Sequence, residues 1–246
     1  MQMSDMSFDL FYHFLDEWAP QADQLADRFR NAQPFPHIVL DDFLPAAGAE
    51  FILENFPSPA CRSFGQPDNK FQVRKLGHIQ KNYFRGVPQT LRYLLHDFNS
   101  MAFLEFIERL TGIRGIIPDP HFQGGAFHQI LPGGHLEVHA DFNIDQRRKL
   151  MRRVNALLYF NKDWKSEYGG DLELWDPSLT QCVQRIQPIF NRCVIFETSS
   201  NSYHGHPVPI SENAPATRKS LAFYYYAADQ RAFDPARAHS TIWRDQ

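Results

Sequence analysis

The fold is decided by a series of short strand-like segments that begins with AFHQIL (126–131), HLEVHADF (135–142) and VNALLYF (154–160). It continues with DLELW (171–175), CVQRI (182–186), CVIFE (193–197) and RKSLAFYYYA (218–227). The segments are rich in β-branched and aromatic residues, and Gly, Pro, Asn or Asp residues separate them. A series of this kind predicts a β-sandwich or a β-barrel.

The chain before this series has helical patterning. Apolar residues recur at helical spacing over residues 7–31, with an expected break at Pro20. Residues 88–112 predict two helices that meet near Asn99, and PFPHIVLDDFLP (34–45) predicts a strand between prolines. Helices first and strands later predict an α+β chain with a mainly β core.

Length and composition limit the kinds of protein that the chain can be. It has 246 residues, of which 43% are hydrophobic and 22% charged, as in ordinary globular proteins. We expect one domain, 1–246, with a helix-rich support (1–115), a β core (116–228) and a C-terminal tail (229–246). The formal net charge of −3 argues against bulk nucleic-acid binding. No feature of the sequence predicts an oligomeric state.

Cysteine usage and the N-terminus bear on the compartment. The three cysteines are far apart and form no CxxC pair, which is typical of a reducing compartment. The N-terminus carries acidic residues where a signal peptide needs Lys or Arg, and no apolar run is long enough to span a membrane. We therefore expect a soluble, cytoplasmic protein without membrane contact.

One candidate site follows from residue spacing. His139 and Asp141 are two positions apart in a strand-like segment, so their side chains project from the same face. His204 follows the segment CVIFE and supplies a second imidazole. Two histidines and one carboxylate with open positions form the facial triad typical of non-haem Fe(II) oxygenases.

A second group of residues is suited to an anion. Arg218 and Ser220 share a face of the last strand-like segment, and a guanidinium beside a hydroxyl can hold a carboxylate. Asn155 and Tyr159 share a face of their own segment. If that face points into a barrel, Tyr159 and Arg218 can meet on one anion.

Alternatives remain open for several of these positions. His206 could replace His204 as a ligand, and His135 could line the pocket mouth. Lys219 could replace Arg218, although strand alternation directs Lys219 to the opposite face. The basic run RRKLMRR (147–153) predicts a solvated loop by default, or a segment that guides an acidic substrate.

Taken together, the motifs resemble those of the prolyl 4-hydroxylase-like branch of the Fe(II)/2-oxoglutarate dioxygenases. The residues that carry the resemblance are VHADFN (138–143), RRVNALLYFNKDW (152–164), GGDLELW (169–175), NRCVIFETSSNSYHGHP (191–207) and RKSLAFYYY (218–226). The resemblance implies a double-stranded β-helix, or jelly roll, with N-terminal and flanking helices.

The resemblance also implies roles for individual residues. His139, Asp141 and His204 match the iron ligands, with His204 favoured over His206. Arg218 matches the residue that binds the distal carboxylate of 2-oxoglutarate, with Ser220 and Tyr159 beside it, and Asn155 matches a further residue of this cofactor-binding pocket. The implied cofactors are Fe(II), 2-oxoglutarate as cosubstrate and O2, with ascorbate as a reductant.

The implied activity is hydroxylation of an unactivated C–H bond, with release of succinate and CO2. The substrate classes are a protein side chain of the prolyl type, an amino acid, a glycan or a small metabolite. Two other interpretations compete with this one. The first is a non-catalytic jelly-roll module that binds a metal or an anion, and the second is a cupin-like metalloenzyme that uses Zn or Mn.

Overall fold

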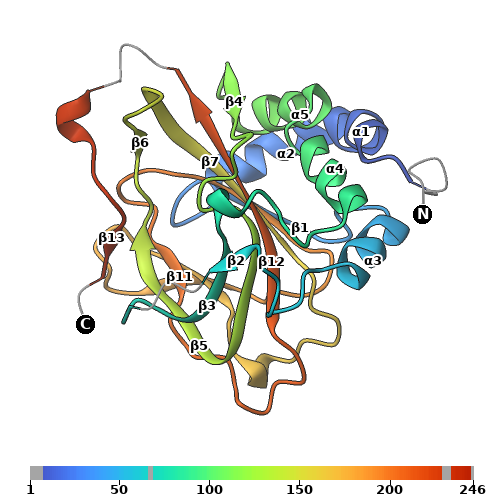
Figure 1. Cartoon of the computed structure of the whole chain (residues 1–246). Helices are drawn as coiled ribbons and strands as arrows, with labels where there is room; N and C mark the ends of the chain where they lie inside the picture. The colour runs from blue at the N-terminus through green and yellow to red at the C-terminus, as the bar shows by residue number, and fades with distance from the viewer. Residues whose placement is uncertain (1–7, 66–68, 229–233, 245–246) are drawn as a thin grey trace.

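A computed structural model describes residues 8–65, 69–228 and 234–244, and its strands form one curled, antiparallel sheet (Figure 1). The thirteen described strands are β1 (His37–Leu40), β2 (Phe64–Gly65), β3 (Gln72–His78), β4 (Ile116–Pro118), β5 (Ala126–Ala140), β6 (Ile144–Asp145), β7 (Leu150–Tyr159), β8 (Leu172–Trp175), β9 (Cys182–Ile186), β10 (Cys193–Glu197), β11 (His204–His206), β12 (Arg218–Ala227) and β13 (Ile242–Trp243). The main path is β1-β10-β7-β12-β5-β11-β8-β9, and β3 and β13 also pair with β5. The predicted α+β jelly roll is confirmed.

Alternation along β7 and β12 separates two faces of the sheet. One face packs against the helices through Val154, Ala156 and Leu158 of β7 and Leu221, Phe223 and Tyr225 of β12. The other face lines a cavity through Asn155, Leu157 and Tyr159 of β7 and Arg218, Ser220 and Tyr224 of β12. Alternate residues of each strand therefore contribute to the core on one face and to the cavity on the other.

Helices cover the first of these faces (Figure 1). They are α1 (Leu10–His13), a π-helical segment (Phe14–Trp18), α2 (Ala19–Asn31), α3 (Ala46–Glu54), α4 (Gln89–Asp97) and α5 (Met101–Thr111), and short 3₁₀ turns occur at Gln80–Asn82, Ser166–Tyr168 and Pro235–Arg237. Phenylalanine side chains dominate the core between helices and sheet, so most of the phenylalanine-rich composition serves packing. Every helix among the described residues is too short or too polar to cross a membrane.

The expected break of the first helix at Pro20 is wrong. A π-helical segment precedes α2, and Pro20 lies in its first turn, where a missing N–H leaves no intrahelical bond unmade. The predicted division near Asn99 is confirmed, because α4 ends at Asp97 and the Ser100 hydroxyl accepts a hydrogen bond from the backbone N–H of Phe103 at the start of α5.

The expectation of separate strands at 126–131 and 135–142 is also wrong, because β5 runs unbroken from Ala126 to Ala140. Gly133 adopts a positive φ of 77°, which bends the strand without ending it. The N–H of Gly133 donates to the Ile210 carbonyl at 2.7 Å, and the N–H of Ile210 donates to the Gly134 carbonyl at 2.9 Å. These hydrogen bonds to Ile210 satisfy backbone N–H and carbonyl groups at the bend.

Strands outside the expected β core also join the sheet. Strand β1 pairs with β10, β3 pairs with β5, and β13, from the segment expected as a tail, pairs with the end of β5. Strand β13 is placed so that Trp243 lies opposite His139. The strands β3 and β13 thus border the region where the predicted metal ligands lie.

Candidate metal centre and active site

The structure brings together the three predicted ligands, which come from segments far apart in the sequence. His139 lies near the end of β5, Asp141 follows that strand, and His204 begins β11 directly opposite His139. One potential ligand atom from each of the three residues lies within 4.8 Å of the other two. The Asp141 carboxylate is 3.7 Å from Nε2 of His139 and 3.5 Å from Nε2 of His204.

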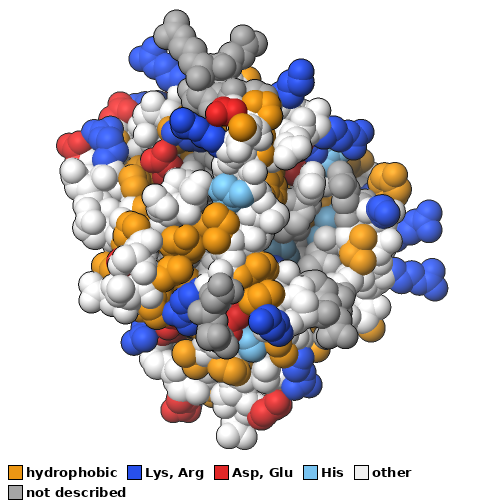
Figure 2. Space-filling view, turned by 90° about the vertical axis from the view of Figure 1, so that its left-hand side faces the viewer, with side chains coloured by type: hydrophobic (Ala, Val, Ile, Leu, Met, Phe, Trp, Pro, Cys, Tyr) orange, Lys and Arg blue, Asp and Glu red, His pale blue; other side chains and the backbone are white. Residues whose placement is uncertain are grey.

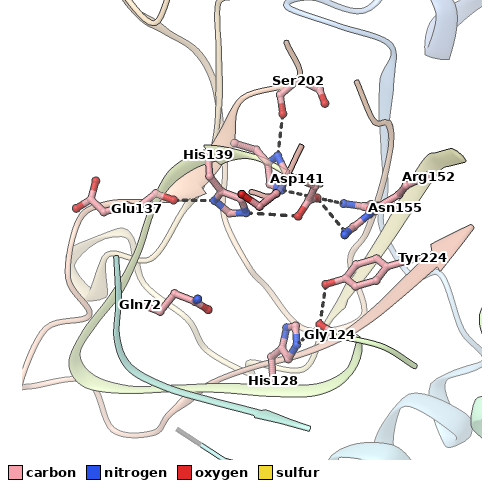
Figure 3. A network of polar contacts seen from close by, with 12 residues as sticks. Gln72, Gly124, His128, Glu137, His139, Asp141, Arg152, Asn155, Ser202 and Tyr224 are labelled. Carbon is pink, nitrogen blue, oxygen red and sulfur yellow. Dashed lines mark hydrogen bonds and ion pairs between the residues drawn. The ribbon is translucent and has the colours of Figure 1, made fainter. Parts of the chain in front are cut away.

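Backbone carbonyls orient both imidazoles. Nδ1 of His139 donates to the Glu137 carbonyl at 2.8 Å, and Nδ1 of His204 donates to the Ser202 carbonyl at 2.9 Å (Figure 3). Because a carbonyl only accepts, the proton of each neutral ring lies on Nδ1, and the lone pair on Nε2 faces the shared space. Burial lowers the pKa of His204 to about 4, so this imidazole is neutral at physiological pH.

The carboxylate is held by side chains of β7. The amide nitrogen of Asn155 donates to Asp141 Oδ2 at 2.9 Å, and Nη2 of Arg152 lies 2.9 Å from the same oxygen (Figure 3). The Arg152 guanidinium stacks on Tyr224, with its central carbon 3.6 Å from the ring centroid. Burial alone would raise the pKa of Asp141, but the charge of Arg152 and the hydrogen bond with His139 hold it well below its usual range.

The predicted anion-binding residues line the same cavity as the metal-ligand cluster. Arg218 is 5% exposed, and its Nε donates to the Gly170 carbonyl at 2.7 Å. Its guanidinium carbon lies 4.9 Å from the centroid of the Tyr159 ring, and Ser220 lies opposite Tyr159 across the two strands. The Tyr159 hydroxyl is buried and has no hydrogen-bond partner among the described residues. A buried cation beside an unpaired hydroxyl is suited to a carboxylate.

Comparison with known proteins identifies this core. The family model of the 2OG-Fe(II) oxygenase superfamily matches residues 125–226, which include all three candidate ligands and the Arg218 group. Residues 125–226 are therefore similar to the 2OG-Fe(II) oxygenase superfamily. The resemblance inferred from the sequence motifs is confirmed.

The proteins that this chain resembles include prolyl hydroxylases. Mouse (Mus musculus) prolyl 3-hydroxylase OGFOD1 is 32% identical over 79 residues, which cover 30% of this chain and 14% of that protein. The chain therefore spans only a small part of this curated relative.

Solved structures share the fold of this chain. A Trichoplax adhaerens prolyl hydroxylase, in complex with a fragment of a hypoxia inducible factor, superposes with a TM-score of 0.63 at 19% identity, covering 93% of this chain and 98% of that one. A Pseudomonas putida prolyl-4-hydroxylase gives a TM-score of 0.56 at 18% identity, covering 85% and 100%. The 2-oxoglutarate-dependent epimerase SnoN also gives 0.56, at 12% identity, covering 92% and 96%. The fold alone therefore does not fix the reaction.

The residues present fit the cofactors that this superfamily implies, Fe(II) and 2-oxoglutarate. Two imidazoles and one carboxylate lie close together, which is the donor set that Fe(II) accepts in such oxygenases. The unpaired Tyr159 hydroxyl and the buried charge of Arg218 complement a carboxylate in the same cavity.

The structure also separates the alternatives that the sequence left open. His206 is buried and lines the cavity, but it is not among the residues of the ligand cluster. His135 contacts Glu137 with a nitrogen–oxygen distance of 3.3 Å, outside the residues that line this cavity. Lys219 also lies outside the lining, and its Nζ donates to the Thr217 carbonyl.

For Arg152, the default interpretation of the basic run as a solvated loop is wrong. Arg152 is 3% exposed and pairs with Asp141, while Arg148 pairs with Asp119 at 3.1 Å. Sequence reasoning missed this role because nothing in the pattern of β7 shows that Arg152 faces the carboxylate that follows β5. It also missed Lys75, Gln72 and Trp243, which line the cavity from β3 and β13.

Proposed function

We propose that this chain is an Fe(II)- and 2-oxoglutarate-dependent dioxygenase that hydroxylates an unactivated C–H bond. One observation carries the proposal: His139, Asp141 and His204 meet at a single point of the cavity that also holds Arg218. When bound, Fe(II) and 2-oxoglutarate supply the chemistry that uses O2 to oxidise the substrate, with release of succinate and CO2.

In this proposal the chain's own residues bind and orient. His139, Asp141 and His204 hold Fe(II) with unprotonated nitrogen and oxygen atoms, and Arg152 and Asn155 keep the carboxylate charged and fixed. Arg218, Tyr159 and Ser220 bind the distal carboxylate of 2-oxoglutarate. Asn155 contacts Asp141, so we assign it to the metal side of the cavity rather than to the distal carboxylate.

The substrate classes follow from the relatives. Prolyl hydroxylases among the similar proteins favour a peptide substrate with a prolyl residue, and an amino acid, a glycan or a small metabolite are the other classes.

We further propose that residues 1–246 act as one domain, that the protein is cytoplasmic, and that ascorbate maintains its iron. Bulk nucleic-acid binding is not part of the proposed function.

The test is anaerobic purification, metal analysis, and titration of 2-oxoglutarate into the metal-loaded protein. Iron-dependent conversion of 2-oxoglutarate to succinate, absent in the His204→Ala variant, is the expected result. Tight zinc without any effect of 2-oxoglutarate on thermal stability would support a cupin-like metalloenzyme instead. Binding of metal and anion without succinate formation across a broad substrate panel would support a non-catalytic module.

A further inference from the structure

A lysine that the proposed function does not use lies in the wall of the cavity. Lys75 of β3 is paired with Ile130 of β5, and Ile130 is paired with Arg218 of β12. Directly paired residues of antiparallel strands project to the same face, so these side chains form one row across three strands. Lys75 and Arg218 therefore enter the same cavity from strands on opposite sides of β5.

Among the described residues, no acidic side chain is paired with Lys75. Asp141 is the only acidic residue among the described residues that line the cavity, against Lys75, Arg152 and Arg218. Arg152 pairs with Asp141, and the proposed function assigns Arg218 to the cosubstrate. The Nζ of Lys75 donates to the Gln72 side-chain oxygen at 3.2 Å, which is a neutral acceptor.

Burial disfavours the charged form of Lys75, and one hydrogen bond to a neutral acceptor does not fully offset this cost. Burial lowers the pKa of Lys75 to about 8, and the charge of Asp141 offsets only part of that effect. A partly buried ammonium with one neutral partner gains from an anion that it can bind directly. Because Gln72 accepts through its oxygen, its amide N–H groups remain to donate to the same anion.

The position of Lys75 distinguishes the primary substrate from the cosubstrate. Lys75, Gln72, Gly124 and His128 line both the cavity of the candidate metal ligands and an adjoining, more open hollow at β2 and β3. Figure 3 shows Gln72 and His128 facing the space beside His139 and Asp141, and Figure 2 shows histidine side chains inside a hollow of the surface. Lys75 thus stands where the interior meets the opening, whereas Arg218 does not line the outer hollow.

We propose that Lys75, assisted by Gln72, binds a carboxylate of the primary substrate at the entrance to the metal cavity. This inference rests on the proposed function, because it assigns the deeper cation, Arg218, to 2-oxoglutarate. The substrate is then a carboxylate-bearing molecule. The carboxylate is either that of a free amino acid or that of an acidic side chain beside the oxidised residue of a peptide.

The direct test uses acetate as the probe. The protein is loaded with diamagnetic Zn(II), saturated with 2-oxoglutarate and ¹³C-dimethylated at its lysines, and the Lys75 signal is the one lost in the Lys75→Arg variant. Acetate should shift this signal with a dissociation constant on the order of 1–10 mM. Acetamide should leave it in place, and the Lys219 signal should respond to neither compound.

A Lys75 signal that ignores acetate, or that responds equally to acetamide, would overturn the proposal. So would a loss of about tenfold or more in 2-oxoglutarate affinity in Lys75→Met, because Lys75 would then belong to the cosubstrate site. Failure of the wild-type protein to bind Zn(II) or 2-oxoglutarate in the preparatory titrations would contradict the proposed function rather than the role of Lys75.

Succinate formation identifies the source of the carboxylate. One arm compares L-proline with L-prolinamide, and the other compares a blocked peptide containing Glu-Pro with its Gln-Pro counterpart. In the arm that matches the substrate, the acidic compound should give about tenfold or more faster succinate formation than its neutral counterpart. Lys75→Met should abolish this difference. Lys219→Met is the matched control and should retain it. Turnover of the neutral member equal to that of its acid would count against the proposal.

Discussion

Replacement of Arg218 by alanine should remove most of the affinity for 2-oxoglutarate while leaving metal binding nearly unchanged. The guanidinium is 5% exposed and donates to the Gly170 carbonyl, so it is already held in place before the cosubstrate arrives. Arg218 is not one of the candidate metal ligands, so its replacement removes no ligand atom. The Nε2 atoms of His139 and His204 would keep their orientation.

The magnitude follows from the burial of the pair. Removal of one partner from a buried ion pair costs about 3–5 kcal/mol, because the other charge is left without compensation. At about 1.4 kcal/mol per tenfold change, the dissociation constant for 2-oxoglutarate should rise by about a hundredfold to several-thousandfold. Arg218→Lys retains the charge but loses the two-pronged geometry and the bond to Gly170, so about a tenfold loss is expected.

Isothermal titration of 2-oxoglutarate into Mn(II)-loaded protein measures these constants, and a separate Mn(II) titration of each variant provides the metal affinity. Lys219→Ala is the matched control, since it removes the neighbouring cation outside the cavity lining. An affinity for 2-oxoglutarate that survives Arg218→Ala but falls in Lys219→Ala would refute the assignment. A parallel loss of Mn(II) affinity in Arg218→Ala would refute the separation of the two subsites.

Three further predictions concern the ligands and the buried titratable groups. His204→Ala should weaken Mn(II) binding by at least about a hundredfold with unchanged circular dichroism, and retained affinity would exclude His204 as a ligand. Lys75→Met should stabilise the apoprotein by about 2–3 kcal/mol at pH 7 in urea unfolding, because the folded-state pKa of about 8 lies below the unfolded value of 10.5. The gain should shrink as pH rises from about 8 to about 10.5, and a gain that does not change with pH would point to packing alone. The metal-free protein should lose stability as pH falls from about 6.5 to about 4, because burial lowers the pKa of His204 and His78 to about 4 and the unfolded chain binds more protons over that range. A flat stability profile over this interval would contradict the burial of these imidazoles.

Much of the inner face could be predicted because strand alternation is a local property. The spacing of Arg218 and Ser220 placed both side chains on one face and Lys219 on the other, and the cavity lining agrees. His139 and His204 could be paired only through motif order, and the register of β5 and β11 brings them face to face. Their role as iron ligands stays a prediction until metal is measured.

The missed elements have weak local signals. Strand β3, QVRKLGH (72–78), has little apolar alternation, and its position is fixed by pairing with β5 rather than by its own pattern. Strand β13 has two residues, and its Trp243 packs on the ring of His139 with centroids 4.9 Å apart. Arg152 looked like one of several solvated cations, because the carboxylate that it neutralises lies outside β7, just after the end of β5.

The orientation of the two imidazoles in the candidate metal centre depends on backbone atoms and therefore tolerates changes of the neighbouring side chains. Each ring is held by the main-chain oxygen two positions before it, and no substitution at Glu137 or Ser202 removes that oxygen. The carboxylate, in contrast, depends on the side chains of Arg152 and Asn155. Substitutions at Glu137 and Ser202 should therefore leave the orientation of both histidines unchanged. Substitutions at Arg152 and Asn155 should change the charge and the position of the Asp141 carboxylate.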